Sequence, residues 1–319
     1  MSLPEYELYQ PRTISEALER AAELNGDSAF VAGGTDLLPS LKQHINPKRH
    51  LISLSRIDAL AKLSPFVLGA GVTIASLIRA GGSIPPVLRE TAKRIAGPAL
   101  REAATVGGNL LFSGRCVYLN RSESYRCSRG ACMKAEGEEC IVVPQKEKCY
   151  APSSGDLAPV FLVLGASFRI AGTGGEQVLP ATRFFRPNGM EANVLQAGEL
   201  LTEVILPRDA GMLEAKYLKL RLRSAMDFPE AGVAAAVKRD AKGVSELRVA
   251  LGALAPNPLY CVKGRDELGD LDARELAQRI WEEVVPDVLA VRNSFFRPSY
   301  RKEMTRLYLR RILEELLQT

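Results

Sequence analysis

Helical and strand-like patterns of hydrophobic residues alternate along the first two hundred residues. The stretch "ISEALERAAEL" spaces its apolar side chains three and four apart, which predicts an amphipathic helix. Thr13 and Glu16 form a capping-box pair at its start, and Gly26 follows its end. Next, "SAFVAGGTDLL" predicts a strand that runs through a glycine turn into a helix. A strand at "HLISL" and a helix at "RIDALAKL" continue the alternation.

The same alternation extends to about residue 207. A strand and turn are predicted within "FVLGAGVTIASLIRAG", and a helix at "PPVLRETAKRIAG", which has proline at its start and glycine at its end. The apolar stretch "GDLAPVFLVLGASFRIAG" ends in a glycine-rich turn, and "GELLTEVILP" reads as a strand. Alternating helices and strands indicate a mixed domain of both element types.

The pattern changes after about Tyr217. "AGVAAAVKRD" and "SELRVALGAL" alternate with a period of two, which favours an antiparallel sheet. Two helices follow, and in the last of them Met304, Tyr308, Ile312 and Leu316 fall on one stripe. We therefore expect an α+β protein with a boundary near 207–212. The first domain would span residues 1–210, and a smaller one, an antiparallel sheet with helices, residues 211–319.

Composition is that of a globular protein with an ordinary core. Hydrophobic residues make up 46% of the 319, and 42 basic against 37 acidic residues give a formal charge of +5, too small to argue for nucleic acid. No secretory signal and no membrane-spanning run stand out, so a cytoplasmic location is expected.

Two glycine turns are candidate phosphate-binding loops. In "AGGTD", residues 32–36, the glycines allow close approach of a ligand to backbone amides. In "AATVGGN", residues 103–109, Thr105 and Asn109 flank Gly107 and Gly108. Neither turn matches the dinucleotide fingerprint or the Walker loop, and an ordinary tight turn is the favoured explanation of each one taken alone.

Five of the six cysteines fall between Gly107 and Cys149, in a segment rich in charged residues, serine and glycine. Such a segment cannot form its own hydrophobic core, and metal ligation would supply the missing folding free energy. Cys127 and Cys132 are the closest pair, with four residues between them, and the only histidines, His44 and His50, are remote. This spacing favours an all-thiolate iron–sulfur cluster over structural zinc, but does not identify which of the five thiols is spare.

Six motifs taken in order carry a resemblance over almost the whole chain: "AGGTDLLPSL", "LGAGVTIASL", "AATVGGNL", "SGDLAPVFLVLGA", "LKLRLRSAMDFPEAGVAAAV" and "LGALAPNPL". Together they resemble the FAD-binding subunit of the molybdenum hydroxylases, the xanthine dehydrogenase and carbon monoxide dehydrogenase family. The resemblance implies a two-part FAD-binding domain followed by a smaller domain. It also implies that the FAD contacts are Ala32, Gly33, Gly34, Thr35, Asp36, Thr105, Gly107, Gly108, Asn109, Asp156 and Lys219.

Alternatives remain for two of these positions, and a neighbouring residue departs from the family pattern. Asp156 is equally suited to capping the following helix, and Lys219 to being a solvated strand residue. Many family members carry an Arg-Asn pair before the second glycine turn, whereas Arg101 is followed here by Glu102, which we expect to point away from a pyrophosphate.

The insertion, residues 115–150, is absent from most of the family. The intervals between Cys116, Cys132, Cys140 and Cys149 resemble those of the 4-hydroxybenzoyl-CoA reductase branch, which carries an extra [4Fe-4S] cluster here. Cys127 would then be unligated. Aldehyde oxidoreductases and xanthine-type hydroxylases with a cluster in this subunit are the nearest alternative, and a zinc-stabilised nucleotide-binding module is a third.

The resemblance further implies an electron-transfer role without catalytic residues of its own. Electrons would pass from ferredoxin through the cluster and FAD to a [2Fe-2S] small subunit and a molybdenum cofactor-binding large subunit, in a dimer of heterotrimers, for reductive dehydroxylation in anaerobic aromatic degradation. No membrane partner is expected. Basic residues of the insertion are candidates for docking an acidic ferredoxin: Arg121, Arg126, Arg129, Lys134, Lys146 and Lys148.

Overall fold

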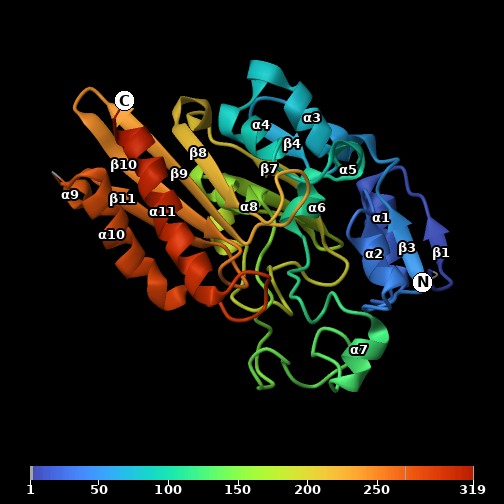
Figure 1. Ribbon diagram of the computed structural model, residues 1–319. Helices are drawn as coiled ribbons and strands as arrows, with labels where there is room; N and C mark the ends of the chain where they lie inside the picture. The colour runs from blue at the N-terminus through green and yellow to red at the C-terminus, as the bar shows by residue number, and fades with distance from the viewer. Residues whose placement is uncertain (1–2, 270, 319) are drawn as a thin grey trace.

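The computed structural model describes residues 3–269 and 271–318. A small parallel sheet at one end of the molecule holds the N-terminal elements (Figure 1). Its strand order is β1-β3-β2, and both outer strands run parallel to β3. Its elements are β1 (Glu7–Tyr9), α1 (Ile14–Glu23), β2 (Ser28–Val31), α2 (Leu37–Lys42) and β3 (His50–Ser53).

A four-stranded antiparallel sheet with covering helices forms the middle of the molecule. The strand order is β4-β7-β5-β6. The strands are β4 (Val67–Gly69), β5 (Ser167–Gly172), β6 (Gly175–Pro180) and β7 (Leu200–Ile205). The helices are α3 (Ile74–Arg79), α4 (Pro86–Ala92), α5 (Pro98–Ala103), α6 (Val106–Leu110) and α8 (Leu157–Val163).

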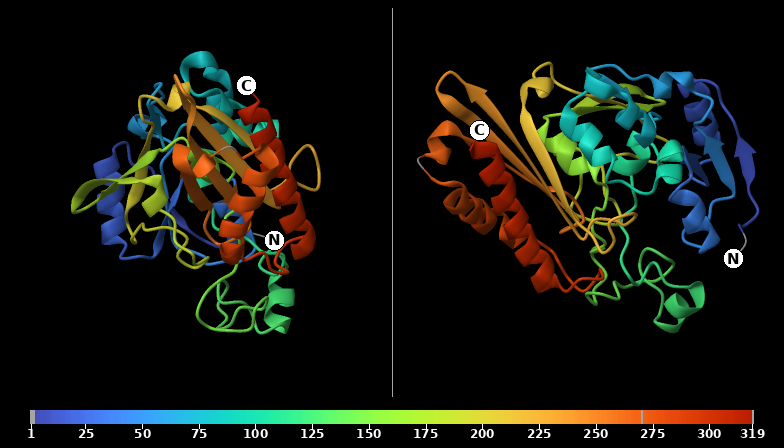
Figure 2. Two further views of the ribbon diagram at one scale, coloured as in Figure 1. Left: turned by 90° about the vertical axis from the view of Figure 1, so that its left-hand side faces the viewer. Right: turned by 45° about the horizontal axis from the view of Figure 1, so that its top comes forward.

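The C-terminal third is a meander with helices on its outer side (Figure 2). Its order is β11-β10-β9-β8, and every neighbouring pair is antiparallel. The strands are β8 (Glu214–Leu220), β9 (Ala231–Asp240), β10 (Gly243–Gly252) and β11 (Leu259–Gly264), and the helices are α9 (Arg265–Leu268), α10 (Ala273–Val284) and α11 (Pro298–Leu317).

The two faces of this meander belong to different hydrophobic cores. Side chains alternate along a strand, so Tyr217, Ala234, Ala236 and Ala250 pack with α8 and the middle sheet. The intervening residues, such as Val233 and Leu251, pack against α10 and α11. The α+β fold is therefore confirmed. One core crosses the expected boundary at residue 210, and the division there stays a prediction.

Several sequence-based predictions of local structure need correction. The helix predicted at 56–63 is a single 3₁₀ turn, Asp58–Ala61. On α11 the buried stripe is Arg301, Thr305, Leu309, Ile312, Leu313 and Leu316, while Met304 and Tyr308 are only half-buried at its edge. The pattern misplaced the first half of the stripe because two of its members are polar. Within the described chain, no helix is both long and apolar enough to span a membrane.

The insertion projects as a separate lobe with one short helix, α7 (Glu123–Ser128), shown in green in Figure 1. Its small core contains Leu119, Cys132 and Ala135, and Ile45 from the turn after α2 completes it. Arg126 is buried and donates to the carbonyl oxygen of Gln43 at 2.5 Å. The lobe thus rests on the N-terminal part of the chain, but four buried apolar groups are far less than an independent domain needs.

Candidate flavin and cluster site

The first glycine turn lies directly against the helix that precedes the second turn. A Cβ atom on Gly33 would overlap the carbonyl oxygen of Ala103 at the end of α5, so only glycine permits this approach. Gly34 has φ +66°, a left-handed conformation that suits glycine. Within the described residues, the amides of Gly33, Gly34 and Thr35 donate to no protein acceptor. Backbone donors left in this way fit a phosphate.

The second glycine turn forms the start of α6. Thr105 caps this helix, and its Oγ1 accepts from the amide of Gly108 at 3.0 Å. The Gly107 amide donates to the carbonyl oxygen of Ala70 at 2.8 Å, and a Cβ on Gly107 would lie 2.8 Å from that of Ala70. Gly107 is buried and serves this packing, whereas Gly108 is exposed. The surface open to a ligand is therefore on the side of Gly108.

Asn109 connects the second turn to α8. Its Oδ1 accepts from the amide of Leu157, the first residue of α8, at 2.9 Å. A Cβ on Gly155 would overlap the backbone oxygen of Asn109, so the two segments touch. Asp156 stands at the N-cap position of α8 but makes no capping hydrogen bond through its side chain. Asn109 serves the helix end instead, which leaves the Asp156 carboxylate for other partners.

The buried Asp156 carboxylate accepts hydrogen bonds from two residues of β8. Tyr217 donates its hydroxyl hydrogen to Oδ1 at 2.8 Å, and Lys219 donates to Oδ2 at 2.9 Å. Tyr217 and Lys219 are two residues apart on a strand, so both side chains leave the same face toward α8. The solvated-strand interpretation of Lys219 is wrong, because its side chain is 1% exposed.

Burial raises the pKa of the Asp156 carboxyl, and the Lys219 ammonium and the Tyr217 hydroxyl oppose that shift. The pKa of Tyr217 lies well above its ordinary value because the hydroxyl is buried beside this carboxyl. Tyr217 thus remains a hydrogen-bond donor, and the three groups form a fixed polar cluster between the two halves of the chain.

Asp36 is held by a residue of the insertion. Arg115 donates from Nη2 to Asp36 Oδ1 at 2.7 Å and to Ser40 Oγ. Burial raises the pKa of Asp36, and the Arg115 guanidinium opposes that shift. Arg115 directly precedes Cys116, so one side chain connects the first glycine turn to the cysteine segment.

Four of the five clustered cysteines line one small pocket: Cys116, Cys132, Cys140 and Cys149. Cys127 is exposed on α7 and lies outside this pocket. Desolvation raises the pKa of both Cys116 and Cys149. Among the residues that the structure describes, no three or more His, Cys, Asp or Glu side chains form a group that could hold a metal ion.

Lys134 lines the same pocket and is 6% exposed. Its Nζ donates to Ser113 Oγ and to the carbonyl oxygen of Gly114, both at 2.8 Å. Lys134 and the equally buried Arg126 cannot dock a ferredoxin, which corrects that part of the sequence-based expectation. Arg121, Arg129 and Lys146 are exposed, and Lys148 is half-buried.

Cys149 is enclosed by a loop from the middle of the molecule. Its amide donates to Asn188 Oδ1 at 3.1 Å, and its carbonyl oxygen accepts from the amide of Gly189 at 2.9 Å. A Cβ on Gly189 would lie 2.9 Å from the Cys149 sulfur.

Glu102 is exposed and pairs with Arg79 at 2.8 Å, on the surface.

Comparison with known proteins identifies the fold and the cofactor of this scaffold. Residues 4–209 match the family described as the FAD binding domain in molybdopterin dehydrogenase. The chain belongs to this family. It is 30% identical to the aldehyde oxidoreductase FAD-binding subunit PaoB of Escherichia coli strain K12, over 85% of this chain and 86% of that protein. It is 27% identical to the carbon monoxide dehydrogenase medium chain of Hydrogenophaga pseudoflava, over 83% of this chain and 80% of the other.

Solved structures of the same fold cover the full chain. Carbon monoxide dehydrogenase from Hydrogenophaga pseudoflava lacking the Mo-pyranopterin moiety matches with a TM-score of 0.73 and 22% identity, over 100% of this chain and 99% of that one. Quinoline 2-oxidoreductase from Pseudomonas putida 86 matches with a TM-score of 0.74 and 20% identity, over the same shares. These likenesses establish the fold of this oxidoreductase family, including the antiparallel second part.

Residues 32–36 and 105–109 adjoin one another through Ala103, and Asp156 adjoins Asn109 through Gly155. The structure thus gathers the expected FAD contacts into one region, with Lys219 entering from β8. The sequence-based interpretation missed Tyr217, the partner of Asp156, and Arg115, the partner of Asp36. The alternation on β8 and the adjacency of Arg115 to Cys116 were the available signals.

Proposed function

We propose that this chain is the electron-transfer subunit of a molybdenum hydroxylase that binds FAD and, in its insertion, a [4Fe-4S] cluster. The observation that carries the second half of this proposal is the convergence of Cys116, Cys132, Cys140 and Cys149 on one pocket, with Cys127 left outside. The insertion has too small a core to hold those four thiols together without a ligand.

The residues around the two glycine turns fit FAD. The unpaired amides of the first turn suit its pyrophosphate, and the exposed side of Gly108 leaves room beside them. When bound, FAD supplies the redox chemistry, while the protein supplies placement and electrostatics. We assign binding to Ala32, Gly33, Gly34, Thr35, Asp36, Thr105, Gly107, Gly108, Asn109, Asp156 and Lys219.

The type and sequence spacing of the ligands support a cluster in preference to zinc. Structural zinc sites usually draw on close pairs of ligands with two to four residues between them, whereas seven or more residues separate Cys116, Cys132, Cys140 and Cys149 from one another. The four thiols line one shared pocket. A [4Fe-4S] cluster held by these thiolates would supply one-electron chemistry at low potential.

We assign the chain to the 4-hydroxybenzoyl-CoA reductase branch of the family because of the sequence intervals between its cysteines. Relatives that match most of this chain are named as a medium chain or an FAD-binding subunit. These names support assembly with a large and a small subunit. We expect the large subunit to bind the molybdenum cofactor, the small one to carry [2Fe-2S] clusters, and the complex to be a dimer of heterotrimers. Ferredoxin would meet the exposed outer side of the insertion, where Arg121 and Arg129 flank the ring of Tyr125.

A second candidate is the FAD and [4Fe-4S] subunit of an aldehyde-oxidising or xanthine-type hydroxylase. The 30% identity to an aldehyde oxidoreductase subunit favours it. Turnover by the complete complex separates the two candidates. Reduction of 4-hydroxybenzoyl-CoA by a low-potential donor supports the first, and oxidation of aldehydes or purines without that reduction supports the second.

Metal analysis tests the cluster directly. Anaerobically purified protein should contain FAD together with about four iron and four acid-labile sulfide per chain, as one cubane requires. Zinc without sulfide would contradict the cluster proposal while leaving the flavin assignment intact.

A pair of cysteine variants tests the ligand set. Cys127→Ser should retain the iron, because this exposed thiol lies outside the pocket, and Cys132→Ser should lose it. Iron content relative to flavin provides the measurement. Equal loss in both variants would show that the ligand assignment is incorrect.

A further inference from the structure

The loop before α11 contacts both ends of the cysteine insertion. The amide of Val117 donates to the backbone oxygen of Asn293 at 3.0 Å. The Asn293 side chain donates from Nδ2 to the carbonyl oxygen of Tyr150 at 2.5 Å. Val117 directly follows Cys116, and Tyr150 directly follows Cys149. One residue of the C-terminal part is therefore bonded next to the first and the last cysteine of the pocket.

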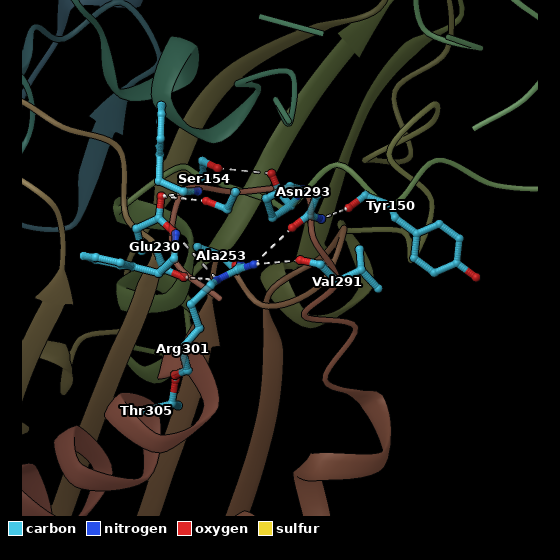
Figure 3. A network of polar contacts seen from close by, with 12 residues as sticks. Tyr150, Ser154, Glu230, Ala253, Val291, Asn293, Arg301 and Thr305 are labelled. Atoms are coloured by element: carbon cyan, nitrogen blue, oxygen red, sulfur yellow. Dashed lines mark hydrogen bonds and ion pairs between the residues drawn. The ribbon is translucent and has the colours of Figure 1, made fainter. Parts of the chain in front are cut away.

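Asn293 is itself held by a buried arginine (Figure 3). Arg301 is 0% exposed and donates from Nη1 to Asn293 Oδ1 at 3.0 Å. Its Nε donates to the backbone oxygen of Glu230 at 2.8 Å, and its Nη2 donates to the backbone oxygen of Ala253. Glu230 directly precedes β9, and Ala253 directly follows β10. Arg301 thus fixes Asn293 to one end of the meander through partners next to two different strands.

The surrounding backbone is fixed by further polar contacts. The Glu230 carboxylate accepts from Ser294 Oγ at 2.6 Å and from the amide of Phe296 at 3.1 Å. On the other side, Ser153 exchanges backbone hydrogen bonds of 2.9 Å with Ala253 and Ala255. Both the loop and the chain that leaves the insertion are therefore attached to the same end of the meander.

Packing alone does not explain this arrangement. Arg301 occupies a position in the apolar stripe of α11, where leucine would pack without the cost of burying a charge. The guanidinium is compensated by the buried Glu230 carboxylate at 4.0 Å and by backbone and amide oxygens, and one of its hydrogen bonds orients Asn293. The network therefore serves the loop and what the loop contacts.

We propose that Asn293, oriented by Arg301, positions Cys116 and Cys149 for cluster binding by holding the backbone that follows each of them. Asn293 is a positioning residue, since it acts through Val117 and Tyr150 rather than by touching the cluster. This inference rests on the proposed cluster. It makes cluster retention depend on the C-terminal part of the chain, which supplies none of the cysteine ligands.

The variant Asn293→Asp tests the proposal with minimal change of shape. The aspartate keeps an oxygen to accept from Arg301 but loses the donor to Tyr150, where two oxygens would then face each other. Iron should be released to a chelator several-fold faster than from the unaltered protein, and the electron paramagnetic resonance signal of the reduced cluster should change. Flavin content should stay the same, because the glycine turns are untouched.

Asn257→Asp is the matched control, because within the described part of the chain the Asn257 side chain donates only to the neighbouring Pro258 carbonyl oxygen, at 3.2 Å. Its iron release and spectrum should match those of the unaltered protein. If Asn293→Asp also matches, the positioning role is overturned while the cluster stands. If the unaltered protein contains no iron and sulfide, the cluster proposal itself fails.

Hydrogen exchange in the unaltered chain gives a second test that needs no variant. Removing iron with a chelator should speed amide exchange at Val117 and also at residues 291–296, because the two segments are bonded through Asn293. Faster exchange within the insertion with no change at 291–296 would overturn the coupling, even if Asn293→Asp does not fold.

Discussion

Asp156 lies at the start of α8, which packs with the middle sheet, whereas Lys219 lies on β8 of the meander. As whole residues, backbone included, they are 3% and 7% exposed. Each would be a costly buried charge without the other, so the pair ties the position of β8 to the start of α8. Asp156 adjoins the second glycine turn, because Gly155 touches the backbone of Asn109 and the Leu157 amide donates to the Asn109 side chain. In the FAD site proposed above, this carboxylate and this ammonium are already ordered by each other before the cofactor binds.

Removing both partners of this pair should cost less than the two single changes added together. Asp156→Asn leaves the Lys219 ammonium buried without its counter-charge, which we expect to lower the free energy of unfolding by about 3–5 kcal/mol. The double variant Asp156→Asn with Lys219→Met should cost clearly less than the sum of the single changes. Chemical denaturation of the four proteins in the cycle measures this coupling. Additive losses would show that the two side chains do not act as a pair.

Lys134 is the buried cation of the cysteine pocket. Lys134→Met removes its charge beside the proposed cluster and its bonds to Ser113 and Gly114, so the midpoint potential of the cluster should become more negative. Lys146→Met is the matched control, since Lys146 lies in the same insertion with an exposed side chain paired to Glu138. Redox titration followed by electron paramagnetic resonance measures both. A potential shared by the two variants would argue against an electrostatic role for Lys134.

The elements differed in how far the sequence could predict them. The strands β9 and β10 lie where the sequence predicted them, although the first seven residues of β9 are all buried because both of its faces pack on hydrophobic cores. The strands β1 and β6 were missed, because both are short or largely exposed and carry little apolar signal. Arg301 and Thr305 were missed as buried residues of α11 because polar side chains interrupt the pattern there. The pairings of Asp156 with Tyr217 and of Asn293 with Tyr150 join residues far apart in sequence, which periodicity cannot reveal.

The loop of residues 187–190 covers Cys149. Gly189→Ala should displace the Cys149 sulfur, because the added Cβ would lie only 2.9 Å from it, and iron retention should fall. Gly174→Ala provides the control, since its Cβ would meet nothing within 4 Å. Iron per flavin in anaerobically purified protein is the measurement. Full iron content in Gly189→Ala would mean that the loop yields without moving the thiol.

At the scale of the whole molecule, the C-terminal part completes both proposed sites. Lys219 reaches the flavin region from β8, and Asn293 reaches the ends of the insertion from the loop before α11. The core that contains α8 also takes Tyr217, Ala234 and Ala250 from the meander. The expected boundary at residue 210 therefore separates lengths of chain that share a core.

This arrangement predicts how the protein behaves when it is divided. Residues 1–210 produced alone should expose the apolar surface of α8 and leave Asp156 without Lys219, so this fragment should aggregate and retain neither FAD nor iron. Co-production with residues 211–319 should restore a soluble complex with both, because the contacts between the parts need no covalent link. Size-exclusion chromatography with flavin and iron analysis measures the outcome. A soluble, iron-loaded fragment 1–210 would show that the insertion holds its cluster without Asn293 and that the first domain is independent of the meander.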